Sequence, residues 1–102
     1  MDKIKMYKMI ADGTSVSVYD VLEWSKWFEI ADRRIAHTQV SDDVEVSTVF
    51  LGLDHSFGGS GSPVLFETMV VGGDLDGEQE RYTTIEDAQQ GHDRMVASVL
   101  RK

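Results

Sequence analysis

The chain has no cysteine and a single proline among its 102 residues. The lack of cysteine excludes disulfide bonds, thiolate metal ligands and thiol nucleophiles. No apolar run approaches the roughly 18 residues that a membrane-spanning helix needs, and the first residues have no secretory signal pattern. Because of these absences, we expect a protein of a reducing compartment, the cytoplasm, with no membrane partner.

Basic residues are also scarce. Ten lysines and arginines stand against eighteen aspartates and glutamates, which gives a formal charge of −8. A surface of this sign repels phosphate backbones and anionic lipids, so nucleic acid is disfavoured as a partner. The acids occur in both halves of the chain, which favours ordinary solubility over an acidic imitation of DNA. The length predicts one domain over residues 1–102.

Alternating apolar residues bounded by turn residues predict the strands of this domain. The pair Asp12-Gly13 is a strong hairpin turn, and two long apolar segments in the middle of the chain have the composition of buried strands. The expected segments are a hairpin over residues 1–18 and strands over residues 35–40, 44–53, 64–71 and 78–82.

Two helices are predicted from apolar residues that recur at helical spacing. Asp20 caps a first helix over residues 21–33, which ends in the basic pair Arg33-Arg34, and a capping box at Thr83 opens a last helix over residues 84–100. Gly91 lies inside the last helix and predicts a close packing contact there. The order of elements predicts an α+β fold, with one antiparallel sheet of five or six strands and two helices on one face.

A ten-residue connector, residues 54–63, joins the two long apolar strands. Hairpin loops normally have about two to five residues, so this length indicates a functional loop. Phe57 would close over a ligand, and the backbone N–H groups of Gly58 and Gly59 would face an anion. The segment contains no lysine or arginine and runs into a strand, so it is not a phosphate-binding P-loop. A plain surface hairpin with Phe57 tucked into the core is the alternative.

Four residues have the chemistry of a hydrolytic metal site or an acid/base pair: Asp54, His55, Glu67 and His92. Their spacing matches no metal-binding or catalytic signature, so no metal or cofactor is assigned. For His92 the favoured interpretation is a core histidine that is hydrogen-bonded to the backbone. For Glu67 it is an inward carboxylate paired with Arg81 or Arg94.

The first helix carries three aromatic residues, Trp24, Trp27 and Phe28, within an arc of about 100°. Core packing with one indole edge at the surface is the simpler interpretation, and a stacking platform for a ligand is the sharper one. The residues predicted to bind a ligand are Trp24, Trp27, His55, Phe57, Gly58, Gly59 and Arg81.

Several segments have a distinctive amino-acid sequence: VSTVFLGLDHSFG at residues 46–58, LFETMV at 65–70, ERYTT at 80–84 and the pair Gly91-His92. Together they resemble a family of small uncharacterised proteins encoded by phages and prophages. The resemblance covers more than half of the chain. It implies a viral origin and expression inside a bacterial host, and it transfers no catalytic residue to this sequence.

The combined expectation is a non-enzymatic accessory protein of phage type. It would act as a homodimer and bind a host protein or a small nucleotide-like ligand. A small metal-dependent or acid/base hydrolase that uses His55, His92 and Glu67 is the second hypothesis, and it requires these groups to meet. A minor virion component is the third, and its mark would be a large exposed apolar patch.

Overall fold

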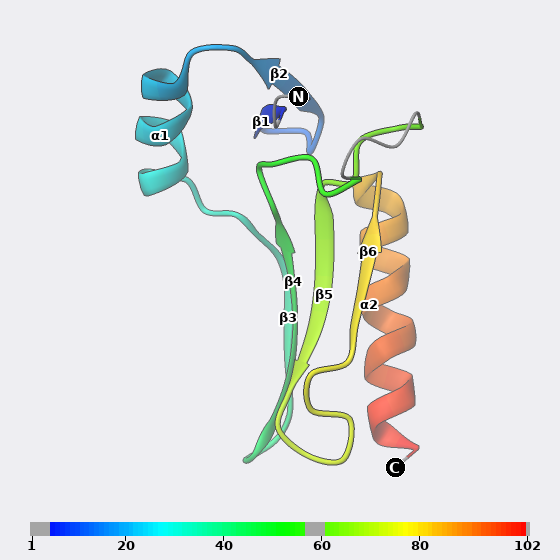
Figure 1. Ribbon diagram of the computed structural model, residues 1–102. Helices are drawn as coiled ribbons and strands as arrows, with labels where there is room; N and C mark the ends of the chain where they lie inside the picture. The colour runs from blue at the N-terminus through cyan, green and yellow to red at the C-terminus, as the bar shows by residue number, and fades with distance from the viewer. Residues whose placement is uncertain (1–4, 57–60, 102) are drawn as a thin grey trace.

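The structure is a computed structural model that describes residues 5–56 and 61–101. Its main body is a four-stranded antiparallel sheet in sequence order, with one helix, α2 (Ile85–Leu100), packed along one face (Figure 1). Phe50, Leu65, Phe66, Tyr82 and Ala88 form the buried core between this sheet and the helix. The four strands are β3 (Arg34–Ser41), β4 (Val44–Phe50), β5 (Phe66–Val71) and β6 (Gln79–Tyr82).

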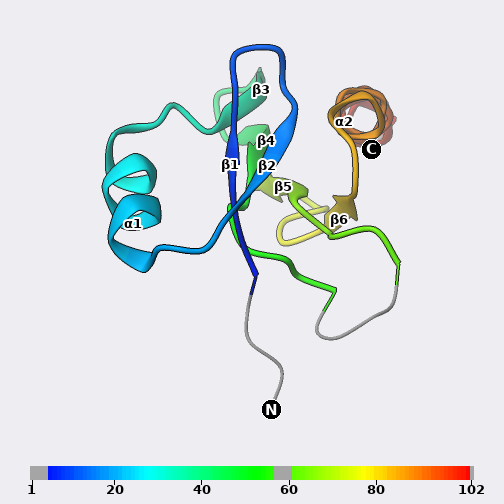
Figure 2. The ribbon, with the colours of Figure 1, turned by 90° about the horizontal axis from the view of Figure 1, so that it is seen from above.

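The N-terminal unit, as we call residues 5–30, lies at the upper end of this body. It consists of a two-stranded antiparallel sheet, β1 (Met6–Met9) and β2 (Ser15–Val18), followed by α1 (Val21–Ile30). Seen from above, the hairpin crosses over the end of the main sheet, and α1 and α2 lie on opposite sides of that sheet (Figure 2). The predicted hairpin is confirmed, and its strands are joined through a turn at Asp12-Gly13.

The predicted α+β fold is confirmed, and the described residues form two helices and six strands, against the five or six strands predicted. The prediction of a single sheet is wrong, because the strands form two sheets. The reason lies at Gly52, whose φ of 80° turns the chain just after β4. The turned segment pairs with β1 through Tyr7 N–H to the Gly52 carbonyl at 2.8 Å, and Met6 and Leu53 form one isolated bridge. The hairpin therefore caps the end of the main sheet. The expectation of both helices on one face is also wrong.

The first helix ends at Ile30 rather than at residue 33. Ala31 is already extended, with φ −72° and ψ 140°, and no basic residue lies in the last turn. Arg33 instead joins β4, because its carbonyl accepts the Phe50 N–H at 2.8 Å and its guanidinium donates to the Phe50 carbonyl at 2.9 Å. The predicted interaction of the basic pair with the helix dipole is therefore wrong. At the other end of α1, Asp20 accepts the N–H groups of Leu22 and Glu23, so the predicted cap is confirmed.

The N-cap of the last helix lies one residue later than Thr83, the residue predicted to open it. Its N-cap is Thr84, whose hydroxyl accepts the Asp87 N–H at 3.1 Å. The two long strands are shorter than predicted, since β4 ends at Phe50 and β5 begins at Phe66. Among the described residues, neither helix is long and apolar enough to cross a membrane.

Candidate functional site

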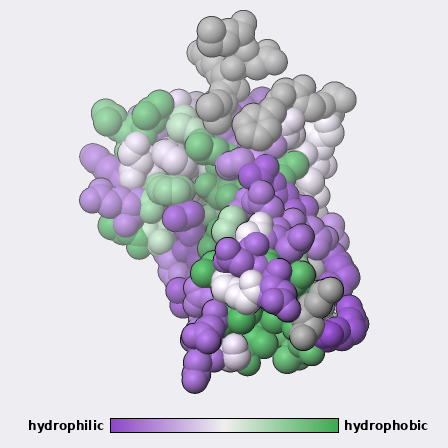
Figure 3. All heavy atoms as spheres, turned by 60° about the horizontal axis from the view of Figure 1, so that its bottom comes forward, coloured by the Kyte–Doolittle hydropathy of each residue, from purple (hydrophilic) through white to green (hydrophobic). Residues whose placement is uncertain are grey.

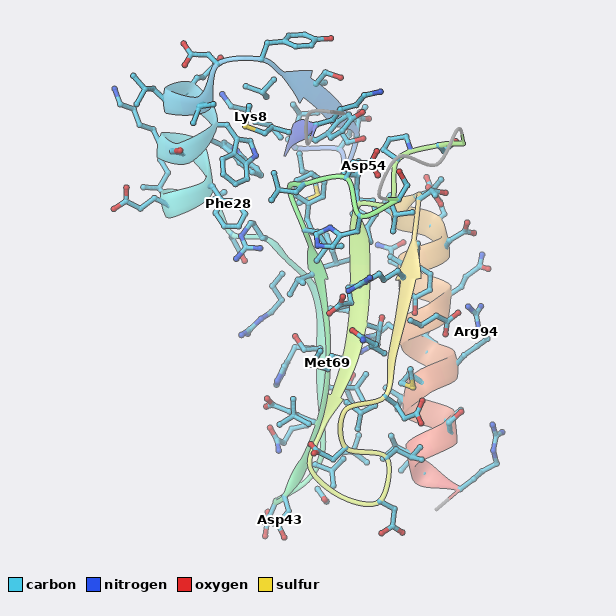
Figure 4. All side chains as sticks on the ribbon, in the orientation of Figure 1. Lys8, Phe28, Asp43, Asp54, Met69 and Arg94 are labelled. Atoms are coloured by element: carbon cyan, nitrogen blue, oxygen red, sulfur yellow. The ribbon has the colours of Figure 1, made fainter. Side chains whose placement is uncertain are left out.

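The base of the connector is closed by one aspartate. Asp54 Oδ1 accepts the N–H groups of Ser56 and Val64, each at 2.9 Å, and the His55 N–H donates to the Val64 carbonyl at 2.9 Å. Partial burial favours the neutral acid, but these hydrogen bonds and the nearby Lys5 charge hold the pKa of Asp54 below its ordinary value. Asp54 lies at the upper end of the main sheet (Figure 4). Its ionised carboxylate there acts as a clasp, since it holds together the two ends of the connector by accepting hydrogen bonds from both.

His55 lies beside this clasp, and its Nδ1 is 2.8 Å from the Leu53 carbonyl. A carbonyl only accepts, so Nδ1 carries the proton in this contact. The other predicted connector residues, Phe57, Gly58 and Gly59, lie outside the described residues. Their predicted contact with a ligand therefore stays a prediction.

The aromatic residues of α1 attach the N-terminal unit to the main sheet. The Trp24 indole N–H lies 3.1 Å from the Tyr7 carbonyl and 3.2 Å from the Gly52 carbonyl, so its polar edge is used inside the protein. Trp27 packs edge-on against Phe50, with ring centroids 5.8 Å apart, and the Arg33 guanidinium lies 3.9 Å above the Phe28 ring. These contacts favour a packing role over a stacking platform.

Gly52 makes this junction possible. Its carbonyl accepts from both Tyr7 and Trp24, and a Cβ on this residue would lie 3.0 Å from the Phe28 ring. A side chain at 52 would meet the aromatic ring in a backbone conformation that only glycine adopts easily. Trp24 and Phe28, whose ring centroids are 4.6 Å apart, thus lie against the backbone at Gly52.

Glu67 and Arg81 lie on the face of the main sheet that α2 does not cover, which we call the open face. They are directly paired across β5 and β6, and Arg81 Nε is 2.8 Å from Glu67 Oε2. The pairing predicted for Glu67 with Arg81 is therefore confirmed, but the carboxylate lies opposite to the helix-covered core. Arg94 instead pairs with Glu80 at 2.9 Å.

A chain of buried polar side chains crosses the other face, under α2. Tyr82 donates to Thr68 at 3.0 Å, Thr68 is hydrogen-bonded to Thr48, and Thr48 Oγ1 lies 2.8 Å from His92 Nδ1. The Nε2 atom of His92 lies 2.9 Å from Thr38 Oγ1. This buried hydrogen-bond chain connects all four strands of the main sheet to α2.

His92 is only 3% exposed, so the prediction of a core histidine is confirmed. Its predicted partner is wrong, because both ring nitrogens meet threonine hydroxyls rather than backbone. A neutral imidazole offers one donor and one acceptor, and two hydroxyls satisfy either tautomer. Burial lowers the pKa of His92, against an opposing effect of Asp93. Burial likewise raises the pKa of the Tyr82 phenol.

The structure does not bring the four candidate catalytic residues together. His92 lies under α2, Glu67 lies on the open face across the sheet, and Asp54 and His55 lie at the base of the connector. Within residues 5–56 and 61–101, no three histidine, aspartate or glutamate side chains are grouped so that they could hold a metal ion. An open hollow of about 490 Å³ lies elsewhere, and its lining is Leu75, Glu78, Met95, Ser98 and Arg101.

Sequence reasoning missed the threonines of the buried hydrogen-bond chain. A signal was present, because Thr48 alternates with Val46 and Phe50, and Thr68 alternates with Phe66 and Val70. Period-2 spacing places both threonines on the buried face. Two hydroxyls facing each other across paired strands, with a histidine in the apolar stripe of a helix, identify such a chain.

We also compared the chain with models of known protein families, with curated protein sequences and with solved structures, and none of them matches.

Proposed function

We propose that this protein is an accessory protein of phage type that acts by binding a host protein through its N-terminal unit. The phage origin rests on the sequence resemblance in residues 46–92. The binding role rests on the surface of the N-terminal unit, and above all on α1.

The observation that carries the proposal is the exposure of apolar side chains. None of the ten residues of α1 is buried, although the helix contains several large hydrophobic ones. Hydrophobic residues are gathered at the surface around α1, at the upper left of Figure 3. Of the nine large hydrophobic side chains exposed among the described residues, six belong to this unit. They are Ile10, Val16, Tyr19, Val21, Leu22 and Ile30.

Concentrated apolar exposure of this kind is typical of a protein-binding surface. A small nucleotide-like ligand is less well supported, because the polar groups predicted to hold it already have internal partners. The Trp24 N–H faces two backbone carbonyls, and Arg81 faces Glu67. The apolar side chains also extend over a hairpin and a helix, which suits a broad contact with another protein.

The placement of the titratable residues supports binding over hydrolysis. His92 and Glu67 lie on opposite faces of one sheet, so they cannot act on one bond without a rearrangement of the fold. Asp54 is used in closing the connector. The hydrolase hypothesis therefore gains no support from the described residues.

A site-specific photo-crosslinker tests the proposal. It replaces Tyr19, whose side chain is 92% exposed, and in a matched control it replaces Gln90, which is exposed on α2. Both variants are expressed in host cells and irradiated. We expect a discrete adduct with one host protein from position 19 only.

The captured protein is then purified and titrated with the unlabelled chain, with and without Val16→Glu. Saturable binding that Val16→Glu weakens at least tenfold supports the proposal. Equal adducts from positions 19 and 90, or adducts only with a second copy of the chain, would contradict it. An adduct with a phage structural protein would replace it by the virion-component hypothesis.

A further inference from the structure

The strand β2 has one paired edge and one free edge. Its paired edge faces β1, and β1 is joined on its other side to the segment after β4, where the Tyr7 N–H donates to the Gly52 carbonyl at 2.8 Å. Among the described residues, β2 has no second strand beside it. In Figure 1, β2 lies farther from the main sheet than β1 does, so the free edge faces away from the main sheet.

The register of the hairpin shows which backbone groups lie along this free edge. In an antiparallel pair, residues that exchange hydrogen bonds with the partner strand alternate with residues whose N–H and C=O groups point away from it. The Tyr7 N–H points away from β2, and Tyr7 is the register partner of Ser17. The N–H and C=O groups of Ser17 therefore point outward, and so do those of Ser15, two residues earlier. Within residues 5–56 and 61–101, these outward groups form no backbone hydrogen bond.

The strand β2 also lacks the features that keep an edge strand from pairing with another chain. Charged side chains, prolines and bulges commonly protect such edges. The outer strands of the main sheet have them, since the register of β3 shifts at two places and β6 carries the charged residues Glu80 and Arg81. The sequence of β2 is Ser-Val-Ser-Val, without a charge, a proline or a register shift. Of these three outer strands, β2 is therefore the one that is open to a further strand.

We propose that an extended segment of the host protein adds to the free edge of β2 as a further strand. Its N–H and C=O groups pair with those of Ser15 and Ser17, whose spacing of two residues is the repeat of a β-strand. This inference rests on the proposed function, because it names how the N-terminal unit holds its partner. The exposed residues Val21 and Leu22 of α1 follow β2 closely along the chain and stay available to the same partner.

The charges around β2 specify the partner further. Asp12 precedes the strand and Asp20 follows it, both are exposed, and neither forms an ion pair with another described residue. Their carboxylates are held in place by the N–H groups of Thr14 and Leu22, at 2.8 Å and 2.9 Å. No lysine or arginine occurs in residues 9–25. A segment with an uncharged centre and a basic residue at each end therefore complements this edge.

Two exposed side chains extend the contact beyond the backbone. Val16 lies between the two serines and is 38% exposed, and Tyr19 follows the strand directly and is 92% exposed. Side chains that lie beside each other on paired strands stabilise the sheet, above all aromatic and β-branched ones. The centre of the partner segment should therefore contain residues of these types.

The variant Ser17→Pro tests the backbone contact. Proline removes the outward N–H of residue 17, and the ladder with β1 stays intact because this N–H takes no part in it. We expect Ser17→Pro to bind the host protein captured through position 19 about tenfold more weakly, since a backbone group of the partner is left unpaired. Ser17→Ala keeps the N–H and should bind within about twofold of the unaltered chain. Circular dichroism confirms that both variants are folded.

Amide hydrogen exchange of the unaltered chain is a second measurement, and it needs no variant. In the complex, the N–H groups of Ser15 and Ser17 should exchange about tenfold more slowly than in the free chain. The Val16 N–H already faces β1 and should change less. Equal exchange rates at Ser15 and Ser17 in the free and bound chain would overturn this inference while the captured host protein leaves the proposed function standing. If position 19 captures no host protein, the proposed function fails too.

The charge of the partner is tested separately. Mass spectrometry identifies the host segment linked to position 19, and we expect an uncharged centre with basic ends. The double variant Asp12→Asn/Asp20→Asn keeps an oxygen acceptor at both positions and should bind several-fold more weakly, with the largest effect at low salt. Asp42→Asn/Asp43→Asn, in the exposed turn between β3 and β4, is the matched control and should bind normally. A linked segment that is helical in the complex, or that has no basic residue, would refute the proposed mode of binding.

Discussion

Gly91 on α2 and Tyr82 on β6 are in contact only because residue 91 has no side chain. A Cβ built on Gly91 would overlap the Tyr82 hydroxyl and the ring carbons beside it. The tyrosine is 6% exposed and belongs to the core cluster, so its ring is not free to swing away. The absence of one methyl group thus sets how closely α2 approaches the sheet.

Gly91→Ala should therefore destabilise the protein, although alanine is the better helix former. In an exposed helix the same change would stabilise by about 1 kcal/mol. Here the overlap forces the helix or the ring to move, and overpacking of this kind costs about 1 to 3 kcal/mol. Urea denaturation measures the difference. Gln90→Ala, one residue away on the exposed side of α2, is the control and should change stability by less than about 0.5 kcal/mol. A Gly91→Ala protein as stable as this control would contradict the prediction.

Stability should also depend on pH through His92. Burial holds the pKa of His92 below its ordinary value of 6.5, so the unfolded chain takes up a proton more readily than the folded one. The contribution of the neutral, buried His92 to the free energy of unfolding is then fully present above pH 6.5. It falls as the pH falls from 6.5 toward the pKa of His92 in the folded protein. Denaturation between about pH 5 and pH 8 measures this slope.

Two variants separate His92 from other titrating groups. His92→Gln should flatten the slope in this range, whatever its effect on the absolute stability. Asp93→Asn removes a carboxylate that raises the pKa of His92, so the loss of stability should extend to lower pH. A slope that survives His92→Gln unchanged would assign the effect to another group.

The sequence predicts those parts of the fold that depend on local patterns. It does not predict the parts that depend on contacts between residues far apart in the chain. The strands, both helices and the tight contact at Gly91 follow from local patterns, and they were predicted. The arrangement of the hairpin was not, because it depends on the turn at Gly52 and on the seat that its carbonyl makes for Trp24. The early end of α1 depends likewise on the pairing of Arg33 with β4.

The candidate site shows the same limit. Residue types identified His92 and Glu67 as candidates, but only the strand register shows that the sheet separates them. The pairing of Glu67 with Arg81 was predictable, since both lie on strands that follow each other along the chain and are joined by residues 72–78. The partners of His92 come from β3 and β4, more than 40 residues away along the chain. No local pattern contains that information.

The hydrogen bond between Thr48 and Thr68 should act cooperatively with its neighbours. Thr48→Val removes one hydrogen-bond partner from Thr68 and one from His92, which keep only Tyr82 and Thr38, and such a loss costs about 1 to 3 kcal/mol. Adding Thr68→Val to Thr48→Val should cost less than Thr68→Val alone, because the bond between the two is already gone. A double-mutant cycle in urea measures the coupling. If the losses of stability in the two single variants simply add up in the double variant, the contacts of the buried hydrogen-bond chain are independent of one another. Ser47→Val on the opposite face is the control.

Asp54→Ala should loosen the base of the connector. It removes the acceptor of two N–H groups, those of Ser56 and Val64, and the expected loss is about 1 to 3 kcal/mol. Asp54→Asn keeps a carbonyl oxygen, so it should lose less. Amide hydrogen exchange locates the effect, since the Val64 N–H should exchange faster in Asp54→Ala. Because the pKa of Asp54 is lowered in the folded protein, the contribution of Asp54 to the free energy of unfolding is present above pH 3.8. This contribution is lost as the pH falls through the pKa of Asp54 in the folded protein. Asp42→Ala, at an exposed turn residue, should leave the Val64 exchange rate unchanged. If the Val64 N–H exchanges at the same rate in Asp54→Ala and Asp42→Ala, Asp54 does not hold the base of this connector together.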